Sequence, residues 1–138
     1  MTISRENNES YLLLTIGNSL VKMRTSNGDL VSNFGENGFV FGVKTLTPPI
    51  IYNNLIYVIT FGSVKFYDLF SGDQKGVIKI HPDNKDFNQG GVPWGGNALD
   101  IKNDILFISL KSFSSKPLEV AAAVPNLKPL VILGGLGS

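Results

Sequence analysis

The residues best suited to chemistry gather in one loop, residues 81–96, with the sequence HPDNKDFNQGGVPWGG. It holds the chain's only histidine, His81, and its only tryptophan, Trp94. One histidine cannot build a multi-histidine metal centre, and Ser-His-Asp catalysis would have to use His81 itself. A histidine beside Pro82 in such a loop is read first as a solvated turn residue. Long loops on a sheet scaffold often carry function, so the loop is the first candidate binding region.

The acidic residues give weaker signals. Asp83 and Asp86 share the loop with asparagines, a spacing that suggests calcium, but the ligand order and terminal glutamate of an EF-hand are missing. A polar loop is therefore the favoured interpretation. Asp68 and Asp73 flank the turn LFSG, and Asp68 is predicted to accept hydrogen bonds from backbone amides in that turn.

Composition excludes several classes of protein. The chain is 43% hydrophobic and 17% charged, with a mean hydropathy of +0.13, which predicts a folded core. The net charge of +1 and scattered basic residues give nucleic-acid binding little support. The absence of cysteine removes disulfides and thiolate metal sites. No signal peptide is visible at the start, and the longest apolar stretch, residues 129–137, is too short to span a bilayer.

A repeated pattern predicts the elements that must position these residues. A polar lead-in, an apolar run and a second strand ending in a Gly-centred turn occur at residues 7–29 and 52–73, and the first half recurs at 102–110. Thr15 and Thr60 lie 45 residues apart, Lys22 and Lys65 lie 43 apart, and Gly28 and Gly72 lie 44 apart. A period of roughly 40–50 residues with paired strands is typical of β-propeller blades.

Short antiparallel strands are predicted throughout the repeats. The expected strands are 11–16, 19–24, 50–52, 55–60, 63–68, 76–80, one near 97–100, and 105–110. The apolar runs at 12–15, 56–60 and 106–109 should occupy equivalent inner strands, and none should be helical.

The predicted fold is all-β, with about two to three four-stranded antiparallel blades of a partial β-propeller in residues 1–110. A propeller closes with about four to eight blades, so the chain reads as a fragment of a longer protein. Its open blade faces should favour self-association. The tail, residues 111–138, is left unassigned as a candidate degraded blade, and its LEVAAAVP (118–125) is the only segment of helical composition. A small all-β domain with an accidental repeat is the alternative.

Four segments in order resemble the quinoprotein dehydrogenases, which bind pyrroloquinoline quinone (PQQ) in an eight-bladed propeller. They are GNSLVKMRTSNGDLVSNFGENGFV (17–40), TPPIIYNNLIYVIT (47–60), GSVKFYDLFSGD (62–73) and WGGNALDIKNDILFIS (94–109). The resemblance implies a periplasmic parent that oxidises a sugar or alcohol by hydride transfer to PQQ, with calcium polarising the reaction. It also implies that Trp94 is the cofactor-binding residue, whose indole forms the floor under the planar quinone.

The resemblance assigns no catalytic or metal-binding residue to this chain. The family's acidic calcium ligand and catalytic aspartate belong to other blades, and Ser112 stands where the alcohol-oxidising branch has a calcium-binding asparagine. Gly76 replaces the tryptophan that usually follows the repeat turn. We therefore expect no catalysis from the chain alone. Two other functions stay open: a non-enzymatic propeller scaffold for protein partners, and a small sugar-binding module that uses the Trp94 loop.

Overall fold

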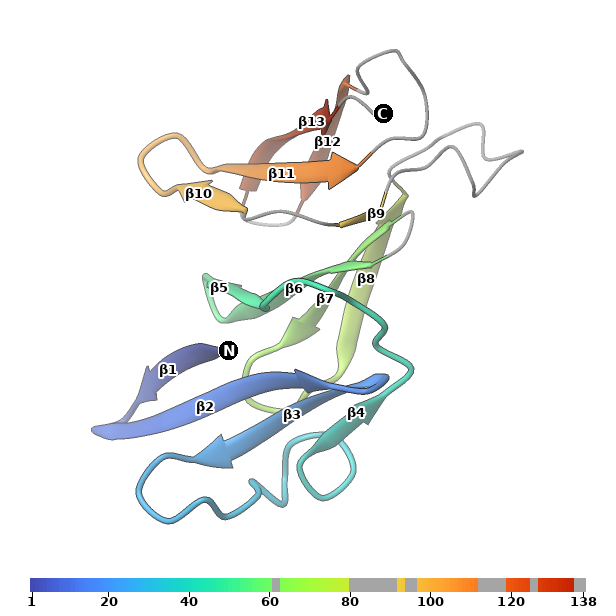
Figure 1. Cartoon of the computed structure of the whole chain (residues 1–138). Helices are drawn as coiled ribbons and strands as arrows, with labels where there is room; N and C mark the ends of the chain where they lie inside the picture. Colours follow the sequence, from blue (N-terminus) through green and yellow to red (C-terminus); the bar gives the residue numbers. More distant parts are fainter. Residues whose placement is uncertain (61–62, 80–91, 94–96, 112–118, 125–126, 136–138) are drawn as a thin grey trace. The chain divides into compact units, whose positions relative to one another are not determined.

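A computed structural model describes residues 1–60, 63–79, 92–93, 97–111, 119–124 and 127–135 (Figure 1). The described residues form strands, turns and connecting loops, and they contain no helix. The expectation of an all-β fold is confirmed for these residues. No helix in this part of the chain is therefore long and apolar enough to cross a membrane.

The first sheet is a four-stranded antiparallel meander in the order β1-β2-β3-β4. Its strands are β1 (Thr2–Glu6), β2 (Glu9–Ile16), β3 (Ser19–Arg24) and β4 (Phe39–Phe41). Asn7 and Asn8, with φ of 48° and 67°, turn the chain between β1 and β2. Asparagine tolerates this left-handed conformation, which suits a tight hairpin. The predicted hairpin of 11–16 with 19–24 is confirmed, while β1 and β4 were not predicted.

The second sheet repeats this arrangement in the order β5-β6-β7-β8. Its strands are β5 (Ile50–Tyr52), β6 (Leu55–Thr60), β7 (Ser63–Asp68) and β8 (Gln74–Lys79). Asn53 and Asn54, with φ of 48° and 60°, make the hairpin turn between β5 and β6. The first three strands match the prediction, and β8 begins two residues before the predicted 76–80.

The third sheet has a different topology, because it contains a parallel pair. Its order is β10-β11-β13-β12, with β9 also paired to β11. Its strands are β9 (Val92–Pro93), β10 (Ala98–Asp100), β11 (Ile105–Lys111), β12 (Glu119–Val124) and β13 (Leu127–Gly135). The segment of helical composition is thus a strand, β12, paired with β13. The three apolar runs lie in β2, β6 and β11, each second in its sheet.

The turns that follow β3 and β7 have the same hydrogen bonds. Gly28 N donates to Arg24 O at 2.9 Å and Arg24 N to Asp29 O at 2.8 Å. Forty-four positions on, Gly72 N donates to Asp68 O at 3.0 Å and Asp68 N to Asp73 O at 2.8 Å. Both glycines have a φ of 77°. The first and second sheets therefore end their third strands in the same way.

The matching turns relate the two segments by 44 residues, so the 43-residue spacing of Lys22 and Lys65 does not pair equivalent positions. With a shift of 44 residues, the position equivalent to Lys22 is Phe66, which follows Lys65. Because side chains alternate between the faces of a strand, one residue decides which face a side chain joins. Lys22 is buried, whereas Lys65 is only half-buried.

The inner face of the first sheet packs on residues of the second sheet, as sheets do when they bury apolar faces against each other. Alternation along β2 and β3 puts Leu13, Leu20 and Lys22 on this face. The buried apolar cluster draws residues from both sheets and from the loop after β3. Its members are Leu13, Leu20, Val31, Phe34, Val43, Ile56, Val58, Tyr67 and Leu69.

The chain divides into two compact units. One contains residues 1–58 and 65–76, and the other contains residues 59–64 and 77–138. The whole buried cluster lies in the first unit. The predicted boundary between residues 1–110 and 111–138 stays a prediction.

Candidate functional site

Most of the site residues expected from the sequence lie outside the described part of the chain. Trp94, His81 and Ser112 are among them, as are Asp83 and Asp86. In the described ranges, no three His, Cys, Asp or Glu side chains lie together in a way that could hold a metal ion. The proposed quinone floor at Trp94 therefore stays a prediction.

Asp68 behaves as predicted, as the residue that organises its turn. Its Oδ1 accepts hydrogen bonds from Phe70 N at 2.9 Å and from Ser71 N at 2.8 Å. The hydrogen bond from the Ser71 amide is the main reason that the pKa of the Asp68 carboxyl is lowered, because it stabilises the charged form. The carboxylate keeps its charge and its role in the turn at neutral pH.

The most unusual group that the structure describes is a buried ion pair on the inner face of the first sheet. Lys22 on β3 is 2% exposed and Glu6 on β1 is 9% exposed. Lys22 Nζ lies 2.9 Å from Glu6 Oε1 and also donates to Leu69 O at 2.7 Å. Ser4 Oγ donates to the other carboxylate oxygen, Glu6 Oε2, at 2.8 Å. Burying a charged lysine is costly unless its charge is paired and hydrogen-bonded; here Glu6 pairs the charge, and two of the three N–H groups have acceptors.

Three aromatic rings surround the ammonium group. Its Nζ lies 4.7 Å from the centroid of the Tyr11 ring, 5.4 Å from that of Phe34 and 5.7 Å from that of Phe70. All three distances are within the range in which a ring face attracts a cation. Phe70 belongs to the turn after β7. The Lys22 cluster, defined as Glu6, Tyr11, Lys22, Phe34 and Phe70, therefore joins the first sheet to this turn.

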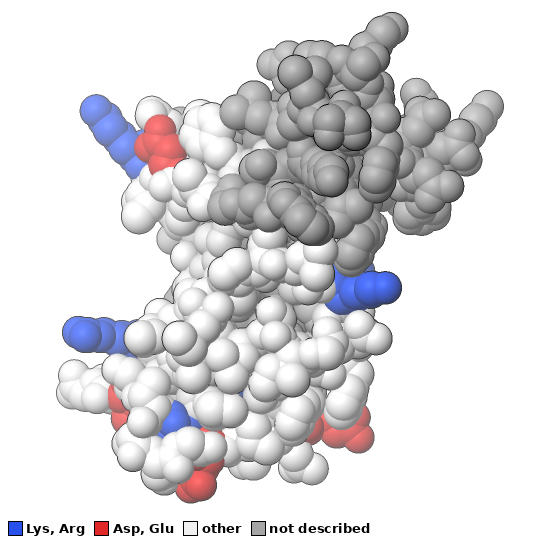
Figure 2. Space-filling model, viewed as in Figure 1, with Lys and Arg blue, Asp and Glu red and all other residues white. Residues whose placement is uncertain are grey.

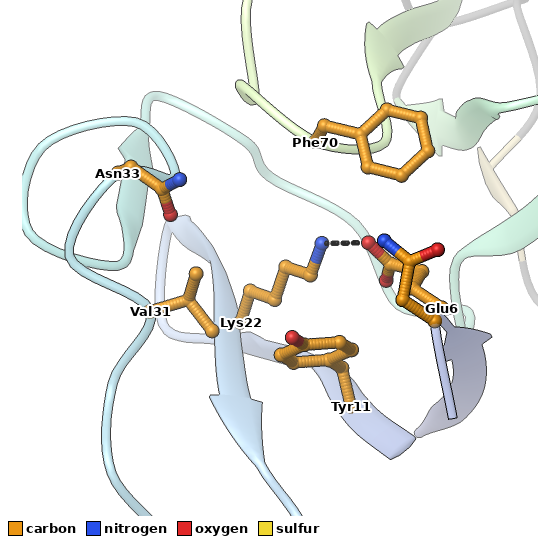
Figure 3. A pocket seen from close by; sticks show the side chains of 7 residues that line it. Glu6, Tyr11, Lys22, Val31, Asn33 and Phe70 are labelled. Atoms are coloured by element: carbon orange, nitrogen blue, oxygen red, sulfur yellow. Dashed lines mark hydrogen bonds and ion pairs between the residues drawn. The ribbon is translucent and has the colours of Figure 1, made fainter. Parts of the chain in front are cut away.

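A small pocket of about 150 Å³ opens beside this cluster (Figure 3). Its wall includes Glu6, Tyr11, Lys22 and Phe70 from the cluster, together with Asn7, Val31 and Asn33. Figure 3 shows the Lys22 side chain reaching between Tyr11 and Phe70 toward Glu6. The Tyr11 hydroxyl donates to Glu9 Oε2 at 2.6 Å, and this hydrogen bond is the main reason that the pKa of Tyr11 is raised.

The geometry gives the Lys22 cluster a mainly structural task. Two of the three N–H donors of Lys22 are used by Glu6 and Leu69, and the two side-chain charges cancel. The pocket is well below the roughly 300–1,000 Å³ of sites for drug-sized ligands. The cluster is therefore suited to hold β1, β3 and the turn after β7 together, and to order small polar groups such as water.

Sequence reasoning did not identify this cluster. Lys22 stands in the strand SLVKMR, two positions from the apolar Leu20 on the same face. A lysine on the apolar face of a strand was the available signal, but its partner Glu6 lies 16 residues away in a strand that the sequence did not reveal. Among the described residues on the face shown in Figure 2, the Lys and Arg side chains are scattered and form no large basic patch.

Comparison with known proteins gives no further guide to function. No protein-family model, curated protein or solved structure matches the chain.

Proposed function

We propose that this chain contributes consecutive blades to a β-propeller of the quinoprotein dehydrogenase kind. The observation that carries the proposal is the pair of matching turns after β3 and β7, each closing the third strand of a four-stranded antiparallel sheet. A propeller blade is such a sheet, and neighbouring blades pack face to face in chain order. The inner face of the first sheet packs on the second sheet in the same order.

The propeller interpretation also explains the contact between the segments FGENG (34–38) and LFSGD (69–73). Gly35 N donates to Ser71 O at 2.7 Å. The Phe-Gly loop, defined as residues 34–38 of the first sheet, is thus joined to the turn after β7 in the second sheet. Phe34 is fully buried beside it. In this proposal the two segments are the contact between one blade and the next, which accounts for the spacing between them.

The cofactor part of the proposal rests on the sequence resemblance and on Trp94. PQQ would accept a hydride from the sugar or alcohol substrate, and Trp94 would stack under the quinone. The described residues offer no cluster of metal ligands. We propose that the catalytic groups belong to other blades and that this chain alone does not catalyse the oxidation.

Titration of the full chain with PQQ and calcium tests the cofactor part. Trp94 is the only tryptophan, so its fluorescence reports directly on the proposed stacking site. We expect saturable quenching, because a quinone stacked on indole provides a route for energy or electron transfer. N-acetyltryptophanamide titrated in parallel corrects for light absorbed by PQQ itself.

Quenching no greater than that of N-acetyltryptophanamide would contradict the PQQ assignment. A fluorescence change with glucose but not with PQQ would favour the sugar-binding module. No response to either ligand would leave the scaffold function as the better account.

A further inference from the structure

The outer face of the first sheet is mostly apolar, and three of its side chains are exposed. Ile3 is 61% exposed, Ile16 is 55% exposed and Phe41 is 63% exposed. The register of the sheet places them on one face with five further apolar side chains. The outer face is defined as Ile3, Leu12, Leu14, Ile16, Val21, Met23, Phe39 and Phe41. Val21 is buried among these side chains, Leu12, Leu14, Met23 and Phe39 are half-buried, and Ile3, Ile16 and Phe41 are exposed. Apolar side chains that gather on one partly exposed face indicate an interaction surface.

The second sheet shows what covers such a face. Thr25 N donates to Ser10 O at 3.1 Å, and 44 positions on Leu69 N donates to Asn54 O at 3.0 Å. With this shift of 44 residues, Leu12 of the first sheet is equivalent to Ile56 of the second.

The same shift gives the remaining pairs. Leu14 corresponds to Val58, and Met23 corresponds to Tyr67. Val58 and Tyr67 belong, with Ile56, to the cluster that the inner face of the first sheet covers. The face that is only half-buried in the first sheet is therefore the face that is fully covered in the second.

The space beside the turn glycine is filled in the second sheet and empty in the first. A Cβ at Gly72 would lie 2.9 Å from Val40 Cγ2, 3.0 Å from Gly35 N and 3.2 Å from Phe34 Cε2. A Cβ at Gly28, which has the same φ of 77°, would meet nothing within 4 Å. Gly72 is capped by the Phe-Gly loop of the first sheet, whereas the space beside Gly28 is open.

We propose that the outer face and the Gly28 turn dock a further four-stranded antiparallel sheet of the same kind. That partner sheet would bring an apolar inner face and a Phe-Gly loop equivalent to residues 34–38. Its lysine would donate to Thr25 O, as Lys22 donates to Leu69 O. Its loop amide would donate to Asn27 O, as Gly35 N donates to Ser71 O.

The occupant is a separate sheet unit and not the first sheet of a second copy. The inner face of this chain's own first sheet is already buried against its second sheet, with Leu13, Leu20 and Phe34 fully buried. It is therefore not available to another molecule. The inference rests on the blade part of the proposed function and is independent of PQQ.

A tandem protein tests the docking. Residues 1–49 are placed ahead of the full chain and joined to Thr2, because Thr2 pairs with Leu13 as Ile50 pairs with Tyr57. The chain has no cysteine, so Ile16→Cys in the full-length copy alone provides one thiol on the outer face. We expect this thiol to react with a maleimide about 10-fold more slowly, or slower still, in the tandem protein than in the undoubled chain.

Two variants make the outcome specific. Lys75→Cys, at an exposed position of β8, should react equally fast in both proteins. Ile3→Glu in the full-length copy should remove the protection of Cys at position 16, because it places a charge in the docked face.

Equal labelling of the outer-face thiol in the tandem and undoubled proteins would overturn the inference. Protection that appears in the undoubled chain and grows with its concentration would also overturn it, by identifying a second copy as the occupant. PQQ titration of the undoubled chain is a separate readout, so a failure of the cofactor proposal is distinguishable from a failure of docking.

Discussion

Lys22→Met is expected to lower the free energy of unfolding by about 3–5 kcal/mol, the cost of removing one partner of a buried ion pair. Methionine replaces most of the aliphatic chain but leaves the Glu6 carboxylate, which is 9% exposed, without its cation. The Leu69 carbonyl also loses its donor. Chemical denaturation, followed by circular dichroism, measures the change.

Two further variants separate the buried charge from general disruption. Glu6→Gln added to Lys22→Met should recover part of the loss, because the unpaired carboxylate is then neutral. Glu9→Gln breaks the exposed Arg24–Glu9 pair, with an Nε–Oε2 distance of 3.7 Å, and should cost less than about 1 kcal/mol. If Lys22→Met costs no more than Glu9→Gln, the Lys22 cluster does not hold the two sheets together.

Gly72→Ala should destabilise the chain by about 2–4 kcal/mol, of which about 1 kcal/mol is the backbone cost of a left-handed alanine and the rest overpacking. The new methyl group would press on Val40, Phe34 and the Gly35 amide. Gly28→Ala is a matched control, because Gly28 has the same φ and the same turn but open space around it. It should show the backbone cost alone, and denaturant midpoints compare the two variants.

The difference between the two alanine variants is the informative quantity. Equal losses at Gly28 and Gly72 would mean that the Phe-Gly loop does not pack on the turn after β7. That outcome would remove the contact on which the blade-to-blade interpretation of FGENG and LFSGD depends.

The sequence predicted the strands that carry a local signal. Alternating apolar residues around Gly17 and the apolar run from Leu55 mark β2, β3 and β6 without help from tertiary structure. The role of Asp68 was also predictable, because an aspartate at the start of a turn bonds the amides that follow it.

The sequence did not reveal β1 and β4, which depend on hydrogen bonding to a neighbouring strand because their own apolar patterns are weak. β1 (Thr2–Glu6) has one strongly apolar residue, and β4 is three residues long between Gly38 and Gly42. Both are edge strands of the first sheet, which form by hydrogen bonding to a neighbour already in place. Without β1 in the prediction, Glu6 could not be matched to Lys22.

The tail illustrates a conflict between composition and pairing. Its alanines favour helix, but β12 pairs with β13, and β13 runs parallel to β11. Parallel partners far apart in the chain leave no local turn signal, so the topology of the third sheet could not be predicted.

We propose that the first and second sheets are two copies of one structural unit. Nuclear magnetic resonance couplings across hydrogen bonds test it directly in the full chain. We expect a coupling between the Gly28 amide nitrogen and the Arg24 carbonyl carbon, and a matching one between Gly72 and Asp68. A coupling in one turn without its counterpart in the other would contradict the claim.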